Sequence, residues 1–128
     1  MENIHVLVCV TGQKSCERLI VEGARLAAEH GGELSVLHVA TQGAAMLGYT
    51  VEGDALEYLY KISCDHGADM TVVRSDAPAE TIAAQVRKKQ VSVVVMGQPR
   101  NRGGRDFMAE LRVHLPDVQF HVVYSEEE

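Results

Sequence analysis

Two polar, glycine-containing stretches of the sequence could bind an anionic ligand. Thr11-Gly12-Gln13-Lys14-Ser15 follows an apolar run, and so does the stretch from Gly97 to Arg105. Each precedes a helical pattern, so each would present backbone N–H groups at a helix N-terminus, where phosphate binds readily. The second stretch adds Arg100, Arg102 and Arg105, whose guanidinium groups can each hold a phosphate through two parallel hydrogen bonds. These stretches predict one anion site if the fold brings them together; the alternative is that the arginines only solvate a loop.

Other chemistries have no matching pattern in the sequence. The six histidines show no H-x-x-x-H spacing and the three cysteines no C-x-x-C, so a metal centre is not expected. Cys9, inside an apolar run, is expected to be an inert core thiol, whereas Cys16 at a helix start could have a lowered pKa. No G-x-S-x-G nucleophile motif is present, and Thr11-Gly12 and Arg74-Ser75 stand where a phospho-relay receiver domain needs acidic residues. We therefore expect a protein that binds a ligand and is not an enzyme.

Apolar runs and helical repeats alternate along the chain, and these elements must position the two stretches. Short β-branched runs are typical of strands buried on both faces, and apolar residues at i, i+3/i+4 and i+7 are typical of amphipathic helices. Gly31-Gly32, Gly67 and Pro116 are expected to end helices. The strands are predicted at residues 4–10, 33–40, 70–73, 91–96 and 118–124. The helices are predicted between the N-cap Ser15 and Gly31, over residues 55–66, from Asp76-Ala77-Pro78 to Lys89, and over residues 107–115.

This alternation predicts an α/β fold, a three-layer sandwich with right-handed crossovers around a five-stranded parallel sheet. Ligands bind such sheets beyond the carboxyl ends of the strands, where the strand order reverses. The two polar stretches meet there if the first and fourth strands are neighbours. A single domain is expected over residues 1–124 with an acidic tail at 125–128, and the connection 41–54 is expected to be mobile or to act as a lid.

The charge and composition narrow the class of partner. Eighteen acidic residues against twelve lysines and arginines give a net charge of −6, whose field repels nucleic acid and anionic membranes. No apolar run approaches about 18 residues and no leader is recognisable, so membrane spanning and secretion are not expected. The odd number of cysteines suits a reducing compartment. We expect a cytoplasmic protein with no nucleic-acid or membrane partner.

Several segments, in order along the chain, resemble the universal stress protein (UspA-like) family. They include Val8-Cys9-Val10-Thr11-Gly12, Ala24-Arg25-Leu26-Ala27-Ala28 and Leu34-Ser35-Val36-Leu37-His38-Val39. Gly97-Gln98-Pro99-Arg100 and the ending from Pro116 to Val123 are similar to the universal-stress-like domain of the potassium sensor kinase KdpD. The resemblance spans nearly the whole chain and includes no histidine-kinase portion, so we expect a stand-alone module.

The resemblance implies a fold of the adenine nucleotide alpha hydrolase-like kind with strand order 3-2-1-4-5. It also implies frequent homodimers through the last strand, here 118–124, and adenine-nucleotide binding in many members. The sequence departs from the nucleotide-binding members in two places. Thr11 stands where they carry Asp, and the glycine motif that begins at Gly97 continues with Arg100 and with an acid, Glu110 or Asp106 depending on the count.

The KdpD-like subgroup implies a second ligand, because some of its members bind cyclic di-AMP. Thr11 and Ser35 fit that pattern, whereas Gln13, Leu34 and His38 replace its Ser, Phe and Tyr. Loss of an aromatic stacking face costs roughly 1–3 kcal/mol per base. His38 itself could stack on a base or donate to phosphate; the alternative is a satisfied, half-buried histidine.

Two functions from different classes follow. The first is a sensor or adaptor module that binds ATP, AMP or cyclic di-AMP between the first and fourth strands, with a protein partner in stress or potassium signalling. The second is a ligand-free dimeric interaction protein with a degraded nucleotide site; a weak nucleotide hydrolase is a more distant third. Under the first function, backbone N–H groups hold the phosphate, from Gly12, Gln13, Gly103 and Gly104, and positive charge comes from Lys14, Arg100 and Arg102. The base or ribose is expected to lie against Thr11, Val39 and Gly97. Ser15 and His38 complete the expected site.

Overall fold

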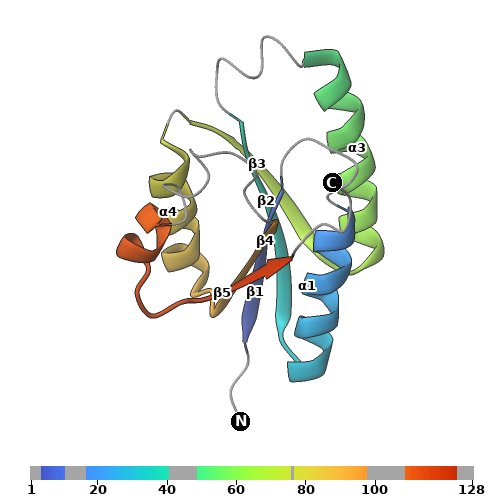
Figure 1. The fold of residues 1–128 in the computed structure, drawn as a ribbon. Coiled ribbons are helices and arrows are strands. Elements are labelled where there is room, and N and C mark those ends of the chain that lie inside the picture. The colour runs from blue at the N-terminus through green and yellow to red at the C-terminus, as the bar shows by residue number, and fades with distance from the viewer. Residues whose placement is uncertain (1–3, 11–16, 41–48, 76, 98–108, 124–128) are drawn as a thin grey trace.

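Five strands alternate with helices along the chain (Figure 1). The structure is a computed structural model, and it describes residues 4–10, 17–40, 49–75, 77–97 and 109–123. The elements are β1 (His5–Val10), α1 (Glu17–His30), β2 (Glu33–Ala40), α3 (Tyr49–Asp65), β3 (Asp69–Arg74), α4 (Pro78–Lys89), β4 (Val93–Gly97) and β5 (Gln119–Val123), with a helical segment at 109–114.

All neighbouring strands in the sheet are parallel, and their order is β3-β2-β1-β4-β5. β1 therefore lies in the middle, with β2 on one side and β4 on the other. This confirms the expected α/β fold and its strand order. Because β3 and β5 each have one strand neighbour, they form the two edges of the sheet.

The apolar residues of the strands divide between two core clusters, one on each face of the sheet. The first joins Val6 and Val8 of β1 to Ile20 of α1 and Leu59 of α3. The second lies under α4 and the 109–114 helix, and it contains Leu7, Leu37, Ile82, Ala83 and Leu111, among others. The predicted apolar face of α4, Ala79, Ile82, Ala83 and Val86, is buried in this second cluster. Helices thus cover both faces, as a buried parallel sheet requires.

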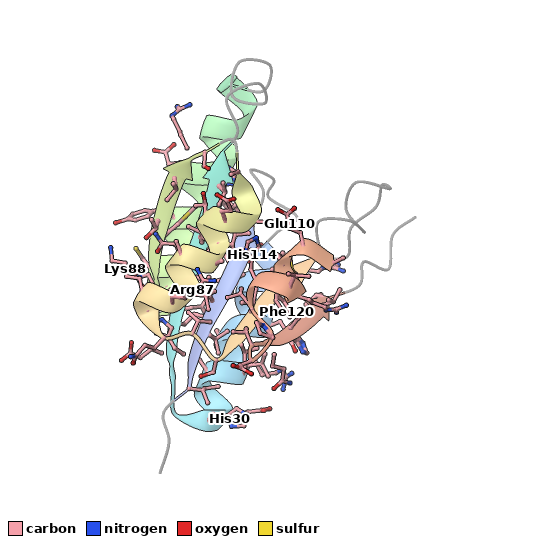
Figure 2. All side chains as sticks on the ribbon, turned by 90° about the vertical axis from the view of Figure 1, so that its left-hand side faces the viewer. His30, Arg87, Lys88, Glu110, His114 and Phe120 are labelled. Carbon is pink, nitrogen blue, oxygen red and sulfur yellow. The ribbon has the colours of Figure 1, made fainter. Side chains whose placement is uncertain are left out.

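On the second face, α4 and the 109–114 helix lie side by side (Figure 2). The Arg87 guanidinium donates a hydrogen bond of 3.3 Å to the backbone oxygen of His114. The His114 ring in turn lies 3.9 Å from the Glu110 carboxylate one turn earlier. The Arg87 bond thus links the 109–114 helix to α4.

Three helices end in the same way, with a residue in the left-handed conformation. Gly31 follows α1 at φ 63° and Gly67 follows α3 at φ 75°. Gln90 follows α4 at φ 56°, although a side chain is strained there. In each case the next residue's N–H bonds back into the last turn: Gly32 to Ala27 O, Ala68 to Ser63 O and Val91 to Val86 O. The glycine stops predicted for the first two helices are confirmed.

The second helix begins earlier than the sequence indicated. It starts at Tyr49 and not at Ala55, so residues 49–54 belong to α3 and the predicted connection 41–54 is wrong over that part. The loop was predicted because the stretch 41–54 is rich in glycine and alanine, and glycines such as Gly53 lower helix propensity. Such intrinsic preferences are weak, and the surrounding fold overrides them here. Residues 41–48 lie outside the described residues.

Within the described ranges, none of the helices combines the length and the apolar character that crossing a membrane requires.

Candidate functional site

The carboxyl ends of β1 and β4 lie next to each other. The register pairs Val8 with Val95, so β1 ends at Val10 beside the end of β4 at Gly97. The chain leaves β1 toward α1, which packs on the first cluster, and leaves β4 toward the 109–114 helix, which packs on the second. The helices that follow the two strands therefore lie on opposite faces of the sheet. This is the topological switch point at which open parallel sheets bind ligands.

Three of the predicted site residues lie in described strands near these carboxyl ends. His38 is in β2, 3% exposed, and its ring Nδ1 donates a hydrogen bond of 3.0 Å to the Val10 carbonyl oxygen. The histidine thus ties β2 to the end of β1, as the structural interpretation of this residue expected. Val39 is half-buried against the second cluster. Gly97 ends β4, and a Cβ there would meet Leu19 Cδ1 at 3.7 Å, so a small side chain would fit.

The remaining predicted site residues lie outside the described residues, and their roles stay predictions. They are Thr11, Gly12, Gln13, Lys14 and Ser15 after β1, and Arg100, Arg102, Gly103 and Gly104 after β4. Arg105, Asp106 and Cys16 also fall in these ranges. What the structure describes is that Val10 and Gly97, the residues immediately before these two segments, end neighbouring strands.

Cys9, next to the switch point, has the environment of a structural thiol. It packs against the second core cluster, and burial raises its pKa to about 12. The thiolate is therefore scarce near neutral pH, and thiolate is the reactive form. This agrees with the expectation of an inert core thiol.

The end of β3 carries hydroxyl groups at the position where a receiver domain needs its phosphoacceptor acid. Ser75 follows Arg74, and its Oγ accepts hydrogen bonds from the Ala77 N–H at 3.0 Å and from Thr81 Oγ1 at 2.7 Å. These bonds hold the start of α4. Arg74 and Ser75, the described residues at this strand end, carry no carboxylate for the phospho-relay alternative, and Asp76 lies outside the described residues.

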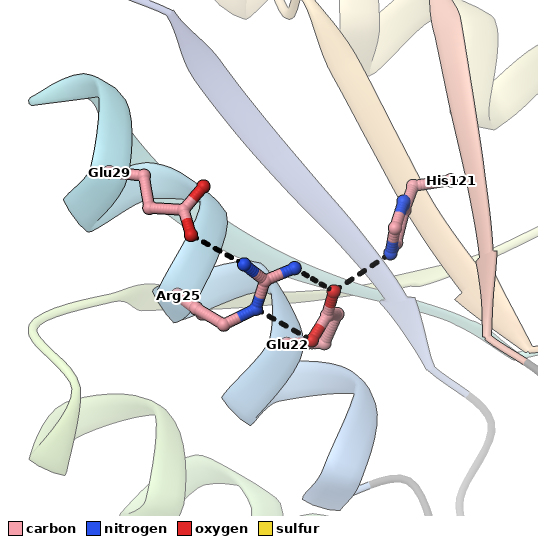
Figure 3. A network of polar contacts seen from close by, with 4 residues as sticks. All are labelled: Glu22, Arg25, Glu29 and His121. Atoms are coloured by element: carbon pink, nitrogen blue, oxygen red, sulfur yellow. Dashed lines mark hydrogen bonds and ion pairs between the residues drawn. The ribbon is translucent and has the colours of Figure 1, made fainter.

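Two side-chain contacts anchor α1, the helix that leads away from the switch point. At its first residue, Glu17 accepts a hydrogen bond of 2.6 Å from the Tyr58 hydroxyl of α3, which raises the pKa of that phenol. One turn further along, Glu22 accepts a hydrogen bond of 2.9 Å from His121 Nε2 of β5 (Figure 3). The start of α1 is thus tied both to α3 and to the edge strand.

Glu22 belongs to a four-residue network on the exposed side of α1 (Figure 3). The Arg25 guanidinium donates to both Glu22 carboxylate oxygens and also to Glu29. The bonds from Arg25, followed by the bond from His121, hold the pKa of Glu22 below its usual range despite partial burial. The carboxylate stays ionised over the physiological pH range.

The sequence indicated only part of this network. Glu22, Arg25 and Glu29 are spaced at i, i+3 and i+7, so their shared exposed face could be predicted. His121 lies 99 residues from Glu22, and no local pattern signals that contact. Tyr58 was missed for the same reason, because its partner Glu17 is on another helix.

Among the described residues, no cluster of three or more histidine, cysteine, aspartate or glutamate side chains could hold a metal ion.

The comparison with protein families gives one match. The family described as "Universal stress protein family" matches residues 3–110. No curated protein matches the sequence.

Solved structures share the fold at low sequence identity. The universal stress protein UspA from Lactobacillus plantarum superposes with a TM-score of 0.73 at 14% identity. The superposition covers 96% of this chain and 99% of the Lactobacillus plantarum chain. A universal stress protein in complex with cAMP gives a TM-score of 0.69 at 16% identity, covering 98% and 100%. The universal stress protein from Archaeoglobus fulgidus in complex with dAMP gives 0.61 at 17% identity, covering 97% and 98%. These similarities establish the common architecture.

Proposed function

The chain belongs to the universal stress protein family, and from that premise we propose that it is a binding module for an adenine nucleotide or an adenine cyclic dinucleotide. The ligand lies beyond the carboxyl ends of β1 and β4. The protein acts as a sensor or adaptor whose ligand-bound form is read by a partner, and it does not turn its ligand over. The reducing environment suggested by its cysteines favours the cytoplasm.

The observation that carries this proposal is the switch point between β1 and β4. Val10 and Gly97 end neighbouring parallel strands, and the chain leaves them toward opposite faces of the sheet. A crevice of this kind opens between two diverging connections, and both of them here carry glycine with polar or cationic residues. Phosphate is the ligand chemistry that backbone N–H groups and guanidinium groups share.

The adenine class is supported by two structural relatives. One was solved in complex with cAMP and another in complex with dAMP. Both have the same architecture as this chain over nearly its full length. An adenine-containing phosphate ligand is therefore the first class to test.

The departures from the family's nucleotide motif bear on which adenine ligand is bound. Thr11 replaces a carboxylate, so a hydroxyl is offered to the ligand in place of an acid. Arg100 and Arg102 would compensate by pairing with phosphate oxygens. Because of the resemblance to the KdpD-like domain, cyclic di-AMP is a candidate ligand together with ATP and AMP. The same resemblance suggests a partner in potassium or stress signalling.

Calorimetric titration of the purified chain with ATP, AMP, cAMP and cyclic di-AMP tests the proposal. At least one of them should bind. The double variant Arg100→Ala/Arg102→Ala should weaken that binding by at least about tenfold for each arginine, because a charge-assisted hydrogen bond contributes roughly 1.5–3 kcal/mol. Binding should also weaken as salt is added.

A control variant of matched charge is Lys61→Ala/Lys88→Ala. Both lysines are exposed on described helices, Lys61 in α3 and Lys88 in the last turn of α4. This variant removes the same two positive charges away from the strand ends, and it should bind the ligand like the unchanged protein. Flat titrations with all four ligands, or an equal loss in both double variants, would reject the site.

The alternative function is a dimeric interaction protein without a ligand. The exposed edge of β5 favours it, because an edge strand offers unpaired backbone groups to a second strand. The Arg100→Ala/Arg102→Ala variant separates the two functions. Under the alternative it leaves both the oligomeric state and partner binding unchanged.

A further inference from the structure

His38 is a buried polar side chain next to the switch point. Side chains alternate along a strand, so His38 shares the face of Leu34 and Val36, which belong to the first core cluster. An imidazole among apolar residues needs hydrogen-bond partners, because a buried polar group without them destabilises the fold. Its Nδ1 donates to the Val10 carbonyl oxygen at 3.0 Å. The ring thus contacts the last residue of β1, at the strand end where the ligand is proposed to bind.

The bond from His38 is not needed to hold β1 and β2 together. The two strands pair in register over the whole of β1, up to Val10 and His38. The backbone hydrogen bonds of such a ladder already join the strands. On the other side of β1, the pairing with β4 stops at Val8 and Val95, two residues before each strand ends. In the described register the end of β1 therefore has its partner on the β2 side, and His38 adds a contact to the carbonyl group at this end.

The Val10 oxygen belongs to a peptide group that also carries an N–H donor. A trans peptide group is planar, and its N–H points opposite to its C=O. A contact that fixes the oxygen therefore also fixes the direction of this N–H, which is the first backbone donor of the polar stretch 11–15. Hydrogen bonds in a chain polarise one another, so a bond to the oxygen also strengthens the N–H as a donor. A donor side chain at His38 can in this way act on a ligand through the backbone.

We infer that His38 is a positioning residue of the nucleotide site. By holding the Val10 oxygen, it orients and strengthens the N–H that donates to an oxygen of the ligand. The imidazole is buried and does not contact the ligand itself. This role rests on the proposed function, and it differs from the stacking or the phosphate contact that the sequence suggested for His38.

Calorimetry with ATP, AMP, cAMP and cyclic di-AMP tests this role in variants of the full chain. His38→Leu keeps a side chain of similar size but removes the donor. It should weaken binding of each nucleotide that the unchanged protein binds by roughly tenfold. His38→Asn should retain the affinity, because the amide nitrogen of asparagine stands where histidine has Nδ1 and can donate to the same oxygen. His38→Gln places its donor one bond further from the backbone, so it should not retain the affinity.

The matched control is Ser63→Ala. Ser63 is fully buried in α3, and its Oγ donates a hydrogen bond of 2.8 Å to the Leu59 carbonyl oxygen. It lies near the end of α3, which leads into the amino end of β3, away from the carboxyl ends of the strands. Ser63→Ala therefore also removes a buried bond from a side chain to a backbone oxygen. Urea denaturation should show that both Ser63→Ala and His38→Leu are destabilised, whereas His38→Leu alone should lose nucleotide affinity.

Equal affinities of His38→Leu and the unchanged protein would overturn the role of His38 and leave the nucleotide site in place. A loss in His38→Asn or in Ser63→Ala as large as that in His38→Leu would indicate a structural effect and would also overturn it. If circular dichroism shows that His38→Leu is not folded, His38→Asn is compared with His38→Gln, and equal affinities of these two overturn the role. Flat titrations of the unchanged protein would reject the proposed function, and the role of His38 with it.

Discussion

Gln90 has a left-handed backbone conformation, and glycine has this conformation at the ends of the other two helices. Its φ of 56° follows α4, whereas Gly31 and Gly67 hold the same position after α1 and α3. A side chain in this region costs roughly 1–2 kcal/mol, and part of this is offset because glycine loses more freedom on folding. The substitution Gln90→Gly should therefore stabilise the fold.

We expect Gln90→Gly to raise the free energy of unfolding by about 0.5–1 kcal/mol, measured by urea denaturation. Gln90 is exposed, so no buried contact is lost. Gln90→Ala keeps the Cβ and serves as the control, which should show no such gain. If the alanine variant gained as much as the glycine variant, backbone strain would not be the cause.

At the scale of elements, the Glu22 network links α1 to β5 in a pH-dependent manner. The pKa of Glu22 is lower in the folded protein than its ordinary value. A lowered carboxyl pKa stabilises the folded state above the unfolded pKa of about 4.3, and this stabilisation is lost as the pH falls through the folded value. Glu22→Gln removes that contribution.

Glu22→Gln should therefore lower the free energy of unfolding at pH 7, by about 0.5–1 kcal/mol for a partly exposed pair. The difference from the unchanged protein should shrink as the pH is lowered from 5 toward 3, because both proteins are then uncharged at this position. Urea denaturation at several pH values measures it, with Glu57→Gln as an exposed control. A difference that stays constant down to pH 3 would contradict the ionic origin.

Elements with a local signal could be predicted from the sequence, and those that depend on distant contacts could not. The strand 33–40 was predicted with the bounds that β2 has, since its apolar run ends at clear boundaries. The apolar face of α4 follows from the spacing of Ala79, Ile82 and Val86. The start of α3 was missed because Gly53 indicates a loop by propensity alone.

The candidate sites divide in the same way. The meeting of β1 and β4 could be expected from the alternation of elements together with the family resemblance. The hydrogen bond from Tyr58 to Glu17 could not be expected, because it depends on how closely α1 and α3 approach each other. The contact of His121 with Glu22 likewise exists only in the folded chain.

At the scale of the whole molecule, β5 forms one edge of the sheet that the described strands make. Its described strand neighbour is β4, and Phe120, His121, Val122 and Val123 are partly exposed. Antiparallel pairing with the same strand of a second copy would cover this edge by a two-fold contact. We expect a homodimer.

Light scattering over a dilution series should give about twice the chain mass of 14.0 kDa at micromolar concentration. The dimer should dissociate on sufficient dilution, since mass action governs it. A mass of one chain across the whole series would contradict pairing through residues 118–124.

The central position of β1 has a consequence for synthesis on the ribosome. Once residues 4–75 have emerged, β1, β2 and β3 can pair under α1 and α3, which cover one face. Leu7 and Leu37 then point to the other face, whose cover comes from α4 and the 109–114 helix. Until those helices are translated, the nascent three-stranded sheet exposes apolar side chains on this face. Chaperones that bind apolar segments should engage the chain in this interval and release it when α4 docks.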